Sequence, residues 1–301
     1  MIYGLSGALV FGSGDFLGGM AAKRMGSLLA TGIAAVVGFV VLLLASLTFI
    51  PGVMSDEAML WGIISGVCGA LAIMLLYAAL AIGPMSILSP LGALVSAIVP
   101  VAFGLIGGEE LAPLGYIALA VGAFAIVLVG FVPEKNAVRP TLRGLSFSVA
   151  SGVFIGLFMI FIDKVPDDSG VIPLVFNRIT SASIMFVAIA VMAFLRWFHK
   201  RGLLGKDGQP RADIAVGENG NRDLRIGILI AVACGVVDVI GNTLLLFGIH
   251  EGNLSVMAVL TAMYPAGTVI LAAIILKERI ARLQLLGMIL AIAAAAMLAL
   301  S

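Results

Sequence analysis

The sequence predicts an all-α integral membrane protein in which ten transmembrane helices form two inverted five-helix repeats. Three observations support this fold: the composition, a series of long apolar runs, and an internal repeat. Of the 301 residues, 62% are apolar and only 11% are charged, whereas soluble domains are about 25% charged. A chain with so few charges is expected to lie in a lipid bilayer.

Apolar runs of the length that crosses a bilayer recur ten times along the chain. Each has about 20 residues, enough to cross ~30 Å of hydrocarbon at about 1.5 Å per residue. The short connections between most runs predict tight helical hairpins. We expect helices at residues 2–22, 27–50, 58–82, 85–107, 112–132, 143–162, 172–198, 224–249, 254–276 and 280–300.

Two connections are longer than the others. Residues 133–142 contain two prolines and several charges, and we expect them to link a first repeat, 1–132, to a second, 143–301. Residues 199–223 are polar, basic and contain glycine, which is typical of a surface loop. Neither stretch is expected to form a domain.

The internal repeat relates the two halves in two registers. Residues 83–109 align without a gap with residues 252–278, in a register that pairs Gly83 with Gly252. Near the starts of the halves, Gly4-Leu5-Ser6 recurs as Gly144-Leu145-Ser146, in a register that pairs Gly4 with Gly144. Because each repeat would hold an odd number of helices, the second is expected to insert upside down relative to the first. Further matching pairs are Gly12/Gly152, Leu17/Leu157, Gly66/Gly235, Ser86/Ser255, Leu91/Leu260, Ala93/Ala262, Ala97/Ala266, Ile106/Ile275 and Glu109/Glu278.

The repeated helix carries a short motif in each half. A Gly-x-x-Ser turn precedes it, a proline lies within it (Pro100 or Pro265), and an acidic residue closes it (Glu109 or Glu278). In these features the chain resembles the EamA-type transporters of the drug/metabolite transporter superfamily. One departure is that the two prolines lie about one helical turn apart in the alignment, which argues against strict symmetry.

The resemblance implies a central cavity and transport of small organic solutes by alternating access. Export of amino acids, metabolites or drugs, driven by an ion gradient, is frequent among such proteins. The sequence has no Gly-rich Lys-Ser/Thr phosphate loop for ATP, and a proton is the expected coupling ion. The helices that the resemblance places around the cavity are 2–22, 58–82, 85–107, 143–162, 224–249 and 254–276.

Other functions have less support in the sequence. The net charge of +1 gives no reason to expect a nucleic-acid partner. We expect no enzyme activity, cofactor or metal site, because no metal-ligand cluster or nucleophile–base motif is recognisable. Aromatic residues make up 7% of the chain and do not gather on one helix, which argues against an aromatic cage for cationic drugs. A sugar- or nucleotide-type importer of the same fold, and a lipid-handling or structural membrane subunit, remain as alternatives.

Two aspartates lie deep inside predicted helices. Asp15 is about 13 residues into 2–22, and Asp238 is about 14 residues into 224–249, with Asn242 and Thr243 one turn further. An aspartate in hydrocarbon costs about 2.5–3.5 kcal/mol on insertion scales, so both side chains should face the protein interior. We expect these four residues to bind the substrate or couple protons; the alternative is that the aspartates only bond neighbouring helices.

A second group of polar residues consists of candidates for lining the cavity. Their hydroxyls could equally bond across helices. These residues are Tyr77, Ser86, Ser255, Thr261 and Tyr264. Arg178, in contrast, is expected to lie near a helix end and to reach the membrane interface.

The basic residues predict an orientation in the cell membrane. The even-numbered connections have only Lys164 and, close by, Arg178, whereas the other 15 of the 17 lysines and arginines flank odd-numbered ones. The positive-inside rule therefore places both termini outside the cytoplasm. The family resemblance suggests the reverse.

Overall fold

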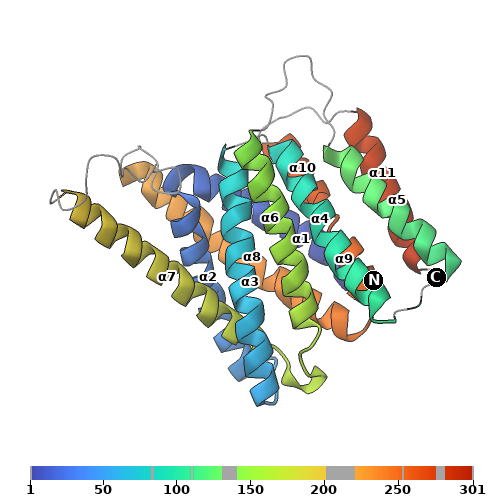
Figure 1. Ribbon diagram of the computed structural model, residues 1–301, viewed down its shortest axis with the longest axis horizontal. Helices are drawn as coiled ribbons and strands as arrows, with labels where there is room; N and C mark the ends of the chain where they lie inside the picture. The colour runs from blue at the N-terminus through green and yellow to red at the C-terminus, as the bar shows by residue number, and fades with distance from the viewer. Residues whose placement is uncertain are drawn as a thin grey trace.

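The computed structural model describes residues 2–82, 85–108, 110, 112–130, 141–200, 221–252, 254–275 and 282–299. These residues form helices, turns and bends, without a β-strand (Figure 1). The predicted linker up to residue 140 and the predicted loop from 201 to 220 lie outside the described residues. The helices are α1 (Ile2–Met25), α2 (Ser27–Thr48), α3 (Asp56–Ile82), α4 (Met85–Ile106), α5 (Pro113–Gly130), α6 (Leu142–Ile162), the 3₁₀ helix η1 (Asp167–Ser169), α7 (Ile172–Lys200), α8 (Asn221–His250), α9 (Leu254–Thr261), α10 (Pro265–Ile275) and α11 (Arg282–Ala299).

Several of these helices have the length and composition of membrane spans. Within the described residues, α2, α3, α6, α7 and α8 each hold a long apolar span. Shorter apolar segments occur in α4, in α5 and across α9 and α10. The fold is therefore that of an all-α, multi-pass membrane protein, as its composition predicts.

The helix predicted at 254–276 is divided in two. α9 ends at Thr261 and α10 begins at Pro265, because a proline lacks the N–H that would continue the helix but is tolerated at a helix start. The backbone between them tightens, with Tyr264 N–H donating to Thr261 O at 3.0 Å. α4, in contrast, continues through Pro100, so the repeated helices differ in continuity.

The helices pack in reciprocal pairs. α1 packs on α8 and α3 packs on α6, while α2 contacts α8 and α3 contacts α7. α2 also packs directly on α7, and α5 on α11, which lie together at one side of the bundle (Figure 1). If the first five helices are matched in order with α6, α7, α8, the α9–α10 pair and α11, each of these contacts has its exchanged counterpart.

Two glycines allow equivalent close approaches in the two halves. A Cβ on Gly66 of α3 would lie 2.7 Å from the Asn177 carbonyl oxygen of α7. A Cβ on Gly235 of α8 would lie 2.7 Å from the Ala34 carbonyl oxygen of α2. Since Gly66 and Gly235 are one of the matched pairs, the sequence repeat coincides here with a packing repeat.

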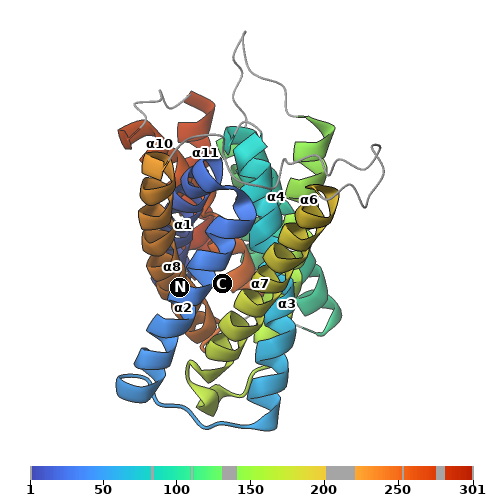
Figure 2. The same cartoon turned by 90° about the vertical axis from the view of Figure 1, so that its left-hand side faces the viewer.

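At one end of the bundle, the connection after α2 packs against the connection that contains η1 (Figure 2). Val53 N–H donates to Asp168 O at 2.9 Å, and His250 Nδ1 lies 3.7 Å from the Asp167 carboxylate. These contacts join the ends of α2 and α8 to the start of α7. Of the helices that these contacts join, α7 and α8 line the cavity described below.

Candidate functional site

A cavity lies among α1, α3, α4, α6, α7, α8 and the α9–α10 break. The space between its walls, with the open mouth included, is about 670 Å³. All six helices that the family resemblance places around a cavity contribute to it, and α7 is added. Its polar lining residues are Asp15, Ser96, Asn177, Arg178, Asp238, Asn242, Thr261 and Tyr264.

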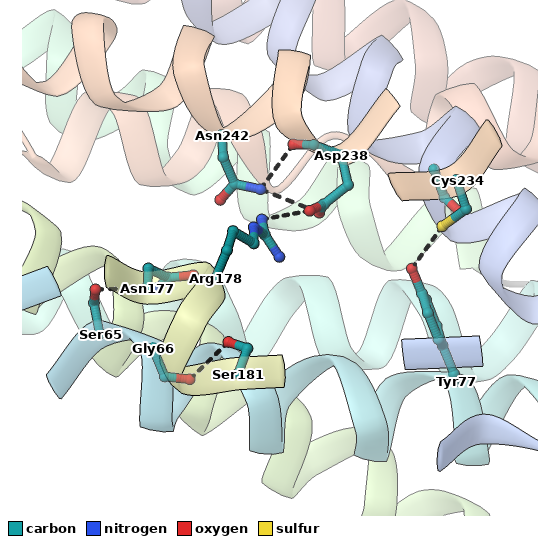
Figure 3. Close-up of polar contacts among 10 residues, drawn as sticks. Ser65, Gly66, Tyr77, Asn177, Arg178, Ser181, Cys234, Asp238 and Asn242 are labelled. Atoms are coloured by element: carbon teal, nitrogen blue, oxygen red, sulfur yellow. Dashed lines mark hydrogen bonds and ion pairs between the residues drawn. The ribbon is translucent and has the colours of Figure 1, made fainter. Parts of the chain in front are cut away.

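An ion pair joins α7 to α8 in this cavity. Arg178 Nη2 contacts Asp238 Oδ2 (Figure 3), and both residues are only 8% exposed. Asn242, one turn after Asp238, donates from Nδ2 to Asp238 Oδ1 at 3.1 Å and to Asp238 O at 2.8 Å. The Asp238 carboxylate is therefore held by a cation on one oxygen and by an amide on the other.

The prediction that Arg178 reaches the membrane interface is wrong. Arg178 is buried and lines the cavity, because its guanidinium pairs with the Asp238 carboxylate of α8. Gly38 of α2 makes room for it, since a Cβ there would lie 3.1 Å from Arg178 Cδ. The prediction depended only on the short distance from Arg178 to its helix start, although an arginine inside an apolar run is itself a signal for a functional site.

Hydrogen bonds between α7 and α3 fix the position of Arg178. Asn177 donates from Nδ2 to Ser65 Oγ at 3.1 Å, and Ser181 donates from its hydroxyl to Gly66 O at 3.0 Å (Figure 3). These residues precede and follow Arg178 on α7. Together with the close contact at Gly66, they hold this turn of α7 against α3.

Asp15 of α1 is the other acidic residue of this cavity. It lines the same cavity and is 6% exposed. Among the residues that the structure describes, none forms a hydrogen bond or an ion pair with its carboxylate. Asp15 is therefore the acid of this cavity that is open to a ligand.

Tyr77 lies at the edge of a second, smaller cavity that Arg178 and Asp238 also line. Its hydroxyl lies 3.0 Å from Cys234 Sγ, and the thiol in turn donates to Gly14 O at 3.3 Å. Tyr264, at the α9–α10 break, also bonds to another helix: its hydroxyl donates to Ser89 O of α4 at 3.4 Å. Both tyrosines thus combine a position at a cavity with a bond between helices.

The structure brings together part of the set of residues predicted to form the site. Asp15, Asp238, Asn242, Thr261 and Tyr264 line the larger cavity. Thr243 is half-buried and Ser255 is buried, but neither lines that cavity. The side chain of Ser86, and the whole of Glu109 and Glu278, lie outside the described residues. The roles of these residues in transport stay predictions.

Aromatic residues from three separate elements reach the cavity. They are Phe11 of α1, Phe158 of α6 and Tyr264 at the α9–α10 break. Because no single helix concentrates aromatic residues, this group could not be predicted from the sequence, and only the fold assembles it. Over the described part of the chain, no group of three or more His, Cys, Asp or Glu residues is arranged to hold a metal ion.

Known proteins resemble this chain in fold and in family. The crystal structure of another protein superposes on this chain with a TM-score of 0.68, over 99% of this chain and 96% of that one. At 19% sequence identity, this likeness shows the fold alone. No curated protein matches the chain. The EamA-like transporter family, however, matches residues 142–300, more than half of the sequence. The chain is therefore a multi-pass membrane transporter and belongs to the EamA-like transporter family.

Proposed function

We propose that this protein is a secondary transporter that moves small organic solutes by alternating access, with its substrate and its coupling proton meeting at Asp15 and Asp238. The observation that carries the proposal is the buried, charged cavity between the two halves of the chain. Export or exchange is the favoured direction. Neither export nor exchange driven by an ion gradient requires an ATP-binding motif.

The cost of the three charges argues for a function. Each ionisable residue at membrane depth costs about 2.5–3.5 kcal/mol on insertion scales. The Arg178–Asp238 pair offsets part of that cost, but a well-packed apolar pair of similar volume is often as stable or more stable. Asp15 has no such compensation among the described residues. A role in binding the solute and the proton would explain why all three charged residues are present despite this cost.

The lining residues support two inverted repeats that meet at the cavity. Several residues on its wall are related to one another by the two registers of the sequence repeat. Because both members of each pair face the same cavity, the axis that relates the repeats is expected to pass through it, as in other inverted-repeat transporters. The pairs are Asp15/Ile155 in the Gly4/Gly144 register, and Gly69/Asp238, Ile73/Asn242 and Leu76/Leu245 in the Gly83/Gly252 register.

In two of these pairs, only one of the two matched residues carries an acidic group. Where Asp15 and Asp238 are acidic, their counterparts Ile155 and Gly69 are not. A symmetric backbone that can open to either side therefore carries a single set of charged groups. One central site is then available alternately to both sides of the membrane.

Coupling follows from competition for a carboxylate. A buried aspartate can hold a proton or the positively charged group of a solute, and one excludes the other. If the solute binds from one side and the proton from the other, each movement of the solute is linked to a proton moving in the opposite direction. This account requires only the groups that line the cavity.

A nucleotide-type solute fits the cavity poorly. Its phosphates would meet two aspartates and one arginine, and that arginine is already paired with Asp238. Phosphate recognition normally uses unpaired arginines, lysines or helix N-termini. The charges therefore favour amines, amino acids or neutral metabolites over nucleotides.

Flux into proteoliposomes tests the proposed function. The purified protein would be reconstituted and supplied with a panel of amines, amino acids, sugars and nucleotides, with and without a pH gradient. We expect at least one small organic solute to move faster than into protein-free liposomes and to respond to the gradient. No movement of any solute, in either direction, would rule the proposal out.

A further inference from the structure

We propose that Arg178 sets the charge of the transported solute, so that the cavity selects small organic amines carrying one positive charge on an apolar or aromatic body. This inference rests on the proposed transport function and narrows its substrate class. It is drawn from the unequal states of the two aspartates and from the aromatic walls.

The first step concerns the net charge of the site. Arg178 is paired with Asp238 and both are buried, so the two charges offset each other. Asn242 satisfies the second oxygen of Asp238. Among the described residues that line the cavity, Asp15 is the one acid without a compensating cation. When both aspartates are ionised, the cavity therefore has a net charge of about −1. A ligand with a single positive charge neutralises it.

The second step concerns the shape of the walls around that charge. Phe11 lies one turn from Asp15 on α1, while Phe158 and Tyr264 face the same cavity from other elements. Aromatic faces attract cations, particularly where water is excluded. Leu76 and Leu245 add apolar surface to the same walls. The aromatic and apolar walls therefore suit the apolar body of an amine, and Asp15 suits its ammonium group.

Other charge classes are disfavoured by the same arrangement. An anion would meet Asp15, and the only arginine lining the cavity among the described residues is bound to Asp238. A dication would need a second free acid, which Arg178 removes. Arg178 thus acts as a tethered cation that occupies one of the two acidic positions and leaves the other for the solute.

The test compares aromatic solutes of similar size and different charge. 2-Phenylethylamine, 2-phenylethanol, 3-phenylpropanoate, phenylalanine and the diamine p-xylylenediamine would compete for uptake in proteoliposomes, and their binding to the detergent-solubilised protein would be measured by calorimetry. In the wild type, 2-phenylethylamine is expected to bind best.

Variants of the ion pair shift the preference in opposite directions. Arg178→Gln frees Asp238 and should raise the affinity for the diamine relative to the monoamine by about tenfold or more, the scale of one close charge contact. Asp238→Asn leaves the Arg178 charge uncompensated and should weaken monoamine binding while allowing phenylalanine or the anion to bind. Asp15→Asn should lose monoamine binding in both assays. Asp56→Asn, the same change at an exposed position on α3, serves as the control.

Each outcome bears on one of the two proposals. If phenylalanine or 3-phenylpropanoate binds the wild type better than 2-phenylethylamine, the inference about charge is overturned while transport stands. It is also overturned if Arg178→Gln, retained in the membrane and folded, keeps the wild-type ranking. If no solute of any charge binds or moves, the transport function fails and the inference fails with it.

Discussion

The hydroxyl of Tyr77 on α3 lies 3.0 Å from the thiol sulfur of Cys234 on α8, joining the two helices that occupy equivalent positions in the proposed repeats. The thiol itself donates to Gly14 O, so the tyrosine O–H donates to the sulfur. In the Gly83/Gly252 register, the counterpart of Tyr77 is Leu246. This polar contact therefore has no equivalent bond at that position in the other half.

We predict that Tyr77→Phe exposes Cys234. The substitution removes the hydrogen bond between α3 and α8, which lowers the cost of separating them. In a Cys68→Ser background, in which Cys234 is the only cysteine, a small thiol reagent should label Cys234 several times faster than in the parent. Tyr116→Phe, at an exposed position on α5, is the matched control. Equal labelling rates in all three proteins would mean that the bond does not hold these helices together.

The Arg178–Asp238 pair makes a prediction about stability. Removing one partner of a buried ion pair costs about 3–5 kcal/mol because the other charge stays buried. Asp238→Asn should therefore lower the thermal unfolding temperature in detergent markedly, and the double variant Arg178→Gln/Asp238→Asn should recover most of the loss. Asp15→Asn should not lower stability and should raise it if anything, since the substitution removes a costly buried charge that has no partner among the described residues. Additive losses in the double variant would show that the pair is not coupled.

Gly38 gives a second way to disturb Arg178. A Cβ at this position would lie 3.1 Å from Arg178 Cδ and 3.3 Å from Val239 Cγ2, so Gly38→Ala forces the arginine to shift. We expect a loss of about 1–3 kcal/mol, typical of an overpacked site, and a smaller loss in an Arg178→Gln background because the sites share a contact. Gly32→Ala on the same helix, where a Cβ meets its nearest atom at 3.4 Å, should be tolerated. A loss that is independent of Arg178 would contradict this account.

The burial of Arg178 also strengthens the charge bias behind the predicted orientation. With Arg178 inside the cavity, Lys164 is the one basic residue left at the even-numbered connections of the sequence. Residues 205–220 belong to an odd-numbered, basic connection and should therefore lie in the cytoplasm, so a cysteine introduced there should react with a membrane-impermeant reagent only after the cells are permeabilised. Reaction in intact cells would favour the orientation that the family resemblance suggests.

The helices were well predicted from the sequence because their signal is local. Apolar runs and the connections between them depend on residues close together in the chain, and the predicted runs coincide with helices to within a few residues. The division at Pro265 was not predicted, although the proline was noted. A proline alone does not decide this, since Pro100 in the matched helix leaves α4 continuous. Which prolines interrupt a helix depends on the surrounding packing.

The site was predictable only in part for the same reason. Asp15, Asp238 and Asn242 could be found from their depth in apolar runs, since burying such groups is costly. Arg178 could not be placed, because its distance from the helix start is compatible with either the interface or the interior, and only the partner on α8 decides. The aromatic group of Phe11, Phe158 and Tyr264 is assembled from distant parts of the chain, so no local pattern reveals it.

The most direct test of the central claim is solute flux driven by a pH gradient in proteoliposomes containing Asp15→Asn or Asp238→Asn. Both substitutions keep the size of the side chain and remove its ability to exchange a proton. With the Asp56→Asn control transporting like the wild type, we expect both variants to be inserted and folded but to lose proton-driven flux. Flux with the wild-type pH dependence in both variants would contradict the account and leave the two aspartates with a structural role.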